Sequence, residues 1–320
     1  MKAYPLLLDP PVKDYIWGGN RLETEFGYSS KSGRSAEAWV LSCHKDGSSI
    51  VKNGPLAGYP LNEALSFFDG DPLGRASAQF SYFPLLIKLI DAHDRLSVQV
   101  HPDDKYALSH EGEYGKTEMW YVIDCKPGAE LIYGLNRSVT KDEFRKRIEN
   151  NTLTDICRFV PVHPGDVFFI PSGTLHAIGS GILIAEVQQN SNTTYRVFDY
   201  GRPGADGKPR PLHIDKAIDV TNTEASAFVP SATGNTIKTD FGDVKTIAAC
   251  RYFTVEIMNI DGETDILSRD SFTSLVILDG SVVVSCDHGP LNAKKGSGVF
   301  IPAGVKANVS GKGRLLVSRV

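Results

Sequence analysis

Two short stretches of the chain carry the residue types of a divalent metal site. Gln99 and His101 stand one residue apart in the first stretch and are followed by Glu118, while the second stretch ends in His176. Two imidazoles and two oxygen donors suit a zinc-like ion that keeps one coordination position open for a substrate. The sequence around these residues must then explain how they meet.

The first stretch predicts two neighbouring strands. Residues 97–101 read Ser-Val-Gln-Val-His, so Gln99 and His101 point to one face of an extended strand and the two valines to the other. A proline and two aspartates end this strand. Glu118 opens a run of Glu-Met-Trp-Tyr-Val-Ile, which is rich in β-forming residues and predicts a second strand.

The second stretch predicts a strand between two turns. Gly165 and Asp166 form a turn, residues 167–170 (Val-Phe-Phe-Ile) form a short apolar strand, and Pro-Ser-Gly at 171–173 forms a tight turn that delivers His176. Small β-barrels place such ligands in their mouths, so we expect the four candidate ligands in the mouth of a barrel.

The segment from Gly165 to His176 resembles the second motif of the cupin barrel: glycine, five residues, proline, one residue, glycine, two residues, histidine. It departs from many cupins at Ser180, where asparagine is common. Gln-x-His at 99–101 replaces the usual His-x-His, and this is similar to the type I mannose-6-phosphate isomerase family. Further segments share that resemblance, which is specific from about residue 17 to residue 202 and weak after residue 221: Trp-Gly-Gly at 17–19, Glu-Ala-Trp at 37–39, Phe-Pro-Leu-Leu-Ile-Lys at 83–88, Lys-x-Glu at 116–118, Glu-Val-Gln-Gln-Asn-Ser-Asn at 186–192 and Thr-Tyr-Arg-Val-Phe-Asp-Tyr-Gly at 194–201.

The resemblance implies an aldose–ketose isomerase that interconverts mannose 6-phosphate and fructose 6-phosphate through an enediol. It also implies one Zn²⁺ per chain, held by Gln99, His101, Glu118 and His176. The enediol oxygens gain negative charge, which a Lewis acid and fixed cations stabilise. Because one ligand is a neutral amide, the site keeps a net positive charge and its ion remains a strong Lewis acid.

Three basic residues are the candidate catalytic cations. By resemblance, Lys88, Lys116 and Arg196 fall at the lysines and the arginine of the family's active site. Lys88 lies inside an apolar run, where a lysine needs a partner or a ligand. The general base stays open between Lys116, Glu37, Asp199 and a metal-bound water.

No Walker A or G-x-G-x-x-G motif marks a phosphate site. Arg202, Lys208 and Arg210 form a modest basic group shortly after Arg196, and we take phosphate contact there as a hypothesis.

An internal echo predicts a second barrel. Residues 295–304 repeat the pattern of residues 164–173, and Ala307 then stands where His176 stands in the first copy. We therefore predict a mainly β protein of two cupin-like, jelly-roll β-barrels with a few short helices. Residues 1–225 would form the metal-binding catalytic domain and residues 226–320 a cupin-like domain without metal ligands, with a linker near 221–239.

Helical expectations are few. Thr140 and Glu143 resemble a capping box, which predicts a helix to about residue 149, and residues 61–67 and 104–110 are weaker helical patterns. Longer members of the family carry a helical insertion between the two metal motifs, and only residues 140–157 could play that part here.

The composition narrows the possible partners. The net charge is −4 and no basic tract compensates it, which argues against nucleic acid. No apolar run reaches membrane-spanning length, and the N-terminus does not resemble a signal peptide. The five scattered cysteines predict reduced thiols in a cytoplasmic protein. The family resemblance implies that its partner is a small sugar phosphate. Oligomeric state has no signal in the sequence.

Three other functions remain alternatives: a metal-dependent cupin oxidoreductase, an isomerase of another sugar phosphate, and a non-catalytic sugar-binding module. Two histidines and a carboxylate also suit iron or manganese, which favours the oxidoreductase. Gln99 and the cations Lys116 and Arg196 favour a polyanionic substrate instead. A binding module fits the second barrel taken alone.

Overall fold

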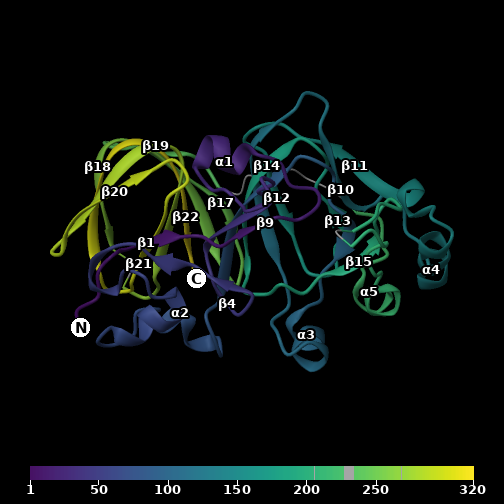
Figure 1. Ribbon diagram of the computed structural model, residues 1–320, viewed down its shortest axis with the longest axis horizontal. Helices are drawn as coiled ribbons and strands as arrows, with labels where there is room; N and C mark the ends of the chain where they lie inside the picture. Colours follow the sequence, from purple (N-terminus) through teal and green to yellow (C-terminus); the bar gives the residue numbers. More distant parts are fainter. Residues whose placement is uncertain (205, 227–233, 268) are drawn as a thin grey trace.

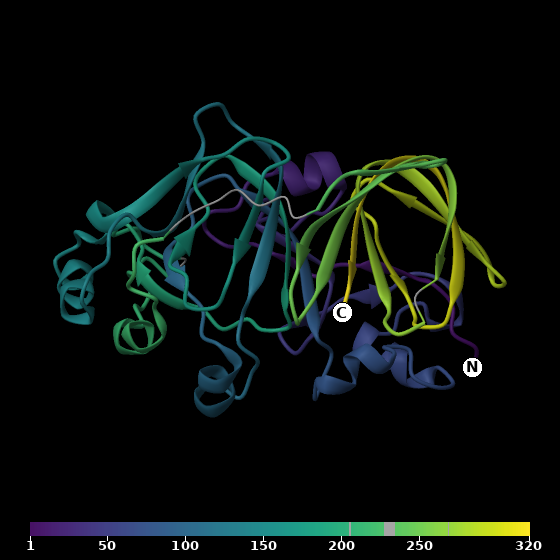
Figure 2. The ribbon, with the colours of Figure 1, turned by 180° about the vertical axis from the view of Figure 1, so that it is seen from behind.

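The computed structural model describes every residue except 205, 227–233 and 268, and it is mainly β. Two barrel-like bodies lie side by side, with the chain ends near the second body (Figures 1 and 2). The prediction of a mainly β fold with a few short helices is confirmed. No helix among the described residues is long and apolar enough to cross a membrane.

The first barrel consists of two antiparallel sheets that face each other. One sheet has the strand order β12 (Val167–Ile170), β9 (Glu118–Cys125), β14 (Ile182–Gln189), β7 (Leu85–Ala92), β3 (Glu37–Leu41) and β2 (Val12–Lys13). The other has the order β11 (Cys157–Pro161), β10 (Glu130–Leu135), β13 (His176–Ala177), β8 (Val98–Val100) and β15 (Tyr195–Phe198). Strands β4 (Cys43–His44) and β5 (Gly47–Ser48) form a separate hairpin.

The second barrel is one nine-stranded sheet. Its order is β16 (Ile237–Thr239), β17 (Gly242–Ala249), β18 (Thr254–Leu267), β22 (Lys306–Arg319), β19 (Thr273–Cys286), β21 (Gly298–Ile301), β1 (Leu6–Asp9) and β6 (Ile50–Val51), with β20 (Gly289–Lys294) paired to β19. Two strands from the start of the chain therefore complete the sheet of the C-terminal barrel. The domain boundary between residues 225 and 226 stays a prediction, and part of the expected linker at 221–239 lies outside the described residues.

Among the described residues, five short α-helices lie around the barrels: α1 (Arg21–Phe26), α2 (Leu61–Ala64), α3 (Asp104–His110), α4 (Lys141–Glu149) and α5 (Ile214–Val220). The capping prediction is confirmed in α4, because the backbone N–H of Glu143 donates to the Thr140 hydroxyl at 3.1 Å. The weaker patterns also form helix, as α3 and as α2 with the short turn of 3₁₀ helix that follows it.

Strands β7 and β14 are buried along their whole length because they lie between the two barrels. One face of β7 packs Leu85, Ile87 and Leu89 into a cluster shared with Phe272 and Phe300 of the second barrel. The other face, which carries Lys88, looks into the first barrel. Burial on both faces explains why such strands are almost continuously apolar, and why a charge among them is informative.

The echo in the sequence corresponds to a repeated piece of structure. Strands β12 and β21 are each followed by Pro-x-Gly, and Gly173 and Gly304 have φ values of 87° and 79°, which favour glycine. Ala307 is fully buried in an apolar cluster of the second barrel. In the described part of the chain, the first barrel holds the group of histidine and acidic residues close enough to bind a metal ion.

Candidate active site and metal centre

Strand register brings candidate residues of the first barrel into rows. In the five-stranded sheet, His176 lies opposite Gln99 and Gln99 opposite Arg196. In the facing sheet, Glu186 lies opposite both Trp120 and Lys88. Directly opposed residues of antiparallel strands share a face, so each row points as a unit. The spacing of these residues along the sequence did not predict which of them would be neighbours in the sheets.

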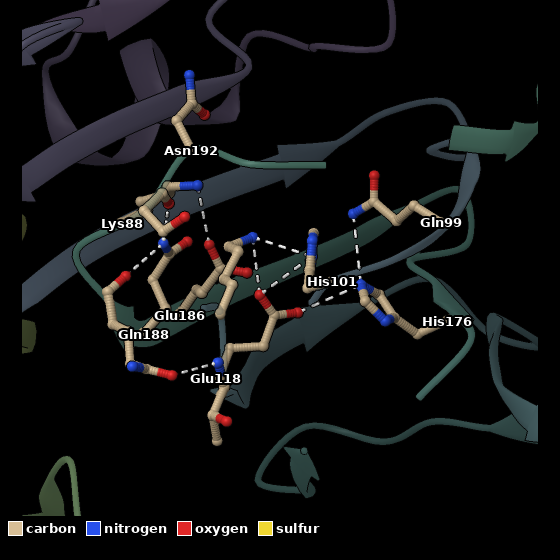
Figure 3. Close-up of polar contacts among 12 residues, drawn as sticks. Lys88, Gln99, His101, Glu118, His176, Glu186, Gln188 and Asn192 are labelled. Carbon is tan, nitrogen blue, oxygen red and sulfur yellow. Dashed lines mark hydrogen bonds and ion pairs between the residues drawn. The ribbon is translucent and has the colours of Figure 1, made fainter. Parts of the chain in front are cut away.

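Three predicted ligands converge inside the first barrel, where Glu118 of one sheet meets His176 of the other. The Glu118 carboxylate lies between two imidazoles, with Oε2 at 3.6 Å from His101 Nε2 and Oε1 at 3.4 Å from His176 Nε2 (Figure 3). One donor atom from each residue lies within 4.8 Å of the others, and all three side chains are buried. This arrangement can hold one divalent ion.

Backbone hydrogen bonds orient both imidazoles. Nδ1 of His101 lies 2.9 Å from the Thr193 carbonyl oxygen, and Nδ1 of His176 lies 2.8 Å from that of Thr174. A carbonyl only accepts, so each Nδ1 carries the proton and each Nε2 presents a lone pair to the centre. Burial lowers the pKa of His176 to about 4 and that of His101 well below its usual value, which keeps both rings neutral.

Gln99 completes the predicted ligand set at the edge of this cluster. Its side-chain amide lies 3.4 Å from Nε2 of His176. The oxygen and nitrogen of an amide exchange places by a half-turn, and that turn presents Oε1 to the centre. The position suits a fourth donor, and the assignment stays a prediction.

The burial and the hydrogen bonding of the Glu118 carboxylate suit a metal ligand. Neither of its buried carboxylate oxygens accepts a hydrogen bond of good geometry from the described residues. Burial and the nearby charge of Glu186 raise its pKa to about 7. The Lys116 ammonium lies 2.8 Å from Oε2, and an ion bound between Glu118 and the two imidazoles would add positive charge on the side of the imidazoles.

Lys116 lies against the candidate ligands, with Nζ at 2.8 Å from Glu118 Oε2 and 3.2 Å from His101 Nε2. Lys88 is fully inside the barrel, 3.1 Å from Glu186 and 3.5 Å from Glu37. The two predicted lysines therefore occupy different places: Lys116 beside the ligands, and Lys88 between two carboxylates.

Glu186 is a site residue that sequence reasoning did not single out. It accepts a hydrogen bond from Trp120 Nε1 at 3.0 Å, and its charge is balanced by lysine. Burial opposes its ionisation, but the nearby charges of Lys116 and Lys88 outweigh burial and lower its pKa. The available signal was an acidic residue in the middle of an apolar strand, which needs a cation nearby.

A cleft of about 280 Å³ reaches the ligand group at Gln99 and Lys116. Its charged lining residues are Glu37, Lys88, Lys116, Glu186, Arg196 and Arg210, and its neutral ones include Ser97, Gln99, Asn192 and Thr194. A larger depression of about 740 Å³ lies elsewhere, beside β10 and β13, and none of the predicted site residues line it. The smaller cleft is therefore the candidate substrate site.

Two guanidinium groups lie along one side of this cleft. Arg196 donates from Nε to the Ser97 hydroxyl at 3.2 Å and from Nη1 to the Pro211 carbonyl at 3.1 Å. Burial and the charge of Arg210 lower its pKa. No ion pair between Arg196 and a carboxylate is present among the described residues, so its charge is available to an anionic ligand.

Only one of the three basic residues that the sequence suggested for phosphate binding lies at the cleft. Arg210 lines the cleft, whereas Lys208 is exposed and Arg202 turns away to donate to the Arg95 carbonyl. Asp199 accepts from both Arg202 and Arg210, at 2.9 and 2.7 Å. Those arginines lower the pKa of Asp199 against the effect of burial, which makes it a poor candidate base.

Comparisons with known proteins agree with this geometry. Residues 6–124 match the family model of the catalytic domain of type I phosphomannose isomerase, and residues 243–320 match that of the cupin domain of mannose-6-phosphate isomerase. The chain is 42% identical over 307 residues to a probable mannose-6-phosphate isomerase of Bacillus subtilis (GmuF), covering 94% of each chain. It is 40% identical over 305 residues to a mannose-6-phosphate isomerase of Streptococcus mutans, covering 95% of this chain and 94% of that one.

Solved structures show the same fold. The crystal structure of a Bacillus subtilis mannose 6-phosphate isomerase matches with a TM-score of 0.88 and 37% identity, covering 99% of both chains. A phosphomannose isomerase variant from Salmonella typhimurium, at 19% identity, matches with a TM-score of 0.78 and 99% coverage of both chains.

Proposed function

The chain belongs to the type I phosphomannose isomerase family, and from that premise we propose that it interconverts mannose 6-phosphate and fructose 6-phosphate with the help of one Zn²⁺ ion. The observation that carries the proposal is the buried group of His101, Glu118 and His176 beside a cleft lined by Lys116 and Arg196.

His101, Glu118 and His176 would hold the ion, with Gln99 as the fourth ligand. The neutral imidazoles and the carboxylate without good hydrogen bonds match the donor set that zinc prefers. A bound Zn²⁺ would act as a Lewis acid that stabilises negative charge on the substrate's carbonyl and hydroxyl oxygens.

The phosphate would bind at the side of the cleft where Arg210 lies. Arg210 is paired with Asp199, whereas Arg196 has no carboxylate partner among the described residues, so the free charge of Arg196 would help Lys116 to stabilise the enediol. Ser97, Asn192 and Thr194 offer polar groups on the same side. The sugar's reacting end would then reach toward Lys116.

Isomerisation moves a proton between C1 and C2 of the open-chain sugar, and the chain supplies both charge stabilisation and the base. Lys116 lies next to the ligands and would stabilise the charge that develops on the enediol oxygens. Two arginines lower the pKa of Asp199 and two lysines lower that of Glu186, so among the side chains of the site Lys116 and Glu37 stay the candidate bases.

An isomerase assay on the purified protein tests the proposal. Fructose 6-phosphate formed from mannose 6-phosphate is measured by a coupled reaction before chelation, after chelation and after Zn²⁺ is added back. We expect turnover that chelation removes and zinc restores. Absent turnover with a metal-loaded site would refute the substrate assignment; oxygen consumption would then point to the oxidoreductase alternative, and turnover of another aldose phosphate to a related isomerase.

A further inference from the structure

The second barrel contacts the metal-site segment through the carboxylate of Asp104, the first residue of α3. Oδ1 accepts from the Gly115 backbone N–H at 2.9 Å and from Gln189 Nε2 at 2.8 Å. Oδ2 accepts from the Tyr252 hydroxyl at 2.9 Å and from Arg251 Nη2 at 3.1 Å. An ionised carboxylate has about four acceptor sites, and here four donors from three separate parts of the chain fill them.

The donors from the second barrel lie in the hairpin between β17 and β18. Tyr252 is 9% exposed, and the turn is closed by a hydrogen bond of 2.9 Å from the Cys250 N–H to the Phe253 carbonyl. Phe253 packs edge-on against Phe169 of β12, with ring centroids 6.3 Å apart. The Arg251 side chain is 70% exposed, so its ion pair is weak, and Tyr252 is the main link.

On the other side of Asp104 the chain leads directly to the metal ligands. Gln189 accepts from the Thr117 N–H at 2.9 Å, and its own backbone N–H donates to the Thr117 carbonyl at 3.1 Å. The Lys116 N–H donates to the Pro102 carbonyl at 3.0 Å. Three consecutive N–H groups at 115–117 are therefore fixed, two of them through Asp104 and Gln189.

Gly115 shows how closely this segment is packed. A Cβ atom at this position would lie 2.4 Å from the backbone carbon of Asp103, so the segment can approach α3 only because residue 115 is glycine. The close approach gives the Asp104 carboxylate its short contact with the Gly115 N–H.

We infer that Tyr252 and Asp104 are positioning residues: the second barrel holds backbone 115–117, and so aligns Lys116 with Glu118 and His101. This gives the barrel without metal ligands a part in the chemistry of the other barrel. The inference rests on the proposed function where it concerns turnover, and on hydrogen bonds alone where it concerns the backbone. Neither Tyr252 nor Asp104 lines the cleft, so both act through Lys116.

Tyr252→Phe is the sharpest test, because it removes the hydroxyl donor and keeps the packed ring. Hydrogen–deuterium exchange of the peptide spanning residues 111–120 reports directly on the Gly115 and Thr117 N–H groups. We expect faster exchange in that peptide, an unchanged KM, and a kcat lowered about 3- to 10-fold, since a shift of about 1 Å at a catalytic group costs about 100-fold. Asp104→Asn should give a larger effect of the same kind.

Lys295→Gln is the matched control. Lys295 also joins the second barrel to the first part of the chain, through a 3.1 Å ion pair with Glu25 of α1, but it is remote from residues 115–117. It should leave the exchange of that peptide and the kcat unchanged. Melting temperature and Zn²⁺ affinity are measured for every variant.

Each outcome is decisive. Unchanged exchange at 111–120 in both Tyr252→Phe and Asp104→Asn would show that these residues do not hold backbone 115–117. Faster exchange with a wild-type kcat would overturn the positioning role. Equal kcat losses in Tyr252→Phe and Lys295→Gln would mean that any loosened barrel contact slows turnover, which also refutes the inference. If the wild-type protein lacks isomerase activity, the proposed function fails. Hydrogen exchange and Zn²⁺ affinity would still test whether Tyr252 and Asp104 hold backbone 115–117.

Discussion

Replacing Lys88 by methionine should destabilise the protein in a way that depends on pH. The substitution keeps the length of the side chain and removes its charge from between Glu186 and Glu37, at 3.1 and 3.5 Å. Glu186 is fully buried, so the variant must either keep a poorly balanced carboxylate inside the barrel or protonate it.

Protonation sets the upper limit of the cost. For a carboxyl group with an ordinary pKa of 4.5, protonation at pH 7 costs about 3.4 kcal/mol, and at pH 5 it costs about 0.7 kcal/mol. Loss of one partner of a buried ion pair typically costs about 3–5 kcal/mol, and protonation of Glu186 holds the cost at the low end of that range. Because Lys116 still lies near Glu186, we expect a loss of about 2–3 kcal/mol at pH 7 and below about 1 kcal/mol at pH 5.

The direction follows from linkage. In the wild type, the two lysines lower the pKa of Glu186, so the stabilising effect of its charge is present above pH 4.5 and is lost as pH falls toward the depressed pKa. In Lys88→Met, the folded state instead binds a proton more tightly than the unfolded state, so its stability falls as pH rises above 4.5. The difference between the two proteins therefore widens from pH 5 to pH 7.

Urea unfolding of the metal-free protein at both pH values measures the effect. Lys13→Met is the matched control: the ammonium group of Lys13 lies 4.4 Å from the centre of the Trp39 ring, near the same strands, but no described residue gives it a buried carboxylate partner. It should change the free energy of unfolding by less than about 0.5 kcal/mol. A Lys88→Met variant as stable as the wild type at pH 7, or equally destabilised at both pH values, would refute the reasoning.

Further predictions concern the metal and the substrate. His176→Ala should lose tightly bound Zn²⁺ and isomerase activity together, measured by metal analysis and the coupled assay; an active, metal-loaded variant would contradict the ligand assignment. Arg196→Ala should keep the metal and lose about 10²–10³-fold in kcat, and near-normal turnover would exclude it as the charge stabiliser. Burial raises the pKa of Glu118 to about 7, so a proton competes with the metal ion below that pH. The Zn²⁺ affinity measured by chelator competition should therefore rise up to about pH 7 and then level. A constant affinity from pH 5.5 to 7 would count against this carboxylate as a ligand. Arg210→Ala should raise KM for the sugar phosphate while Lys208→Ala leaves it unchanged, and equal effects of the two would remove Arg210 from the phosphate site.

Local chemistry explains why much of the candidate site could be predicted from sequence. Alternation within 97–101 turns Gln99 and His101 to one side of β8, and the Pro-x-Gly turn after β12 leads to His176 at β13. Each of these features spans a few residues, and backbone geometry dictates it within that span. The buried strand runs and the repeated turn likewise predicted a mainly β fold with a second barrel.

Tertiary structure alone decided which distant residues became neighbours. Glu186 became the partner of Lys88 through the register of β14 and β7, and Arg210 rather than Arg202 or Lys208 reached the cleft through the course of one loop. The first strand of the chain joined the last barrel, and Tyr252 reached Asp104 across the two barrels. Periodicity and turn chemistry specify a segment's shape and its buried face, whereas strand order, register and barrel docking depend on how all the segments pack together.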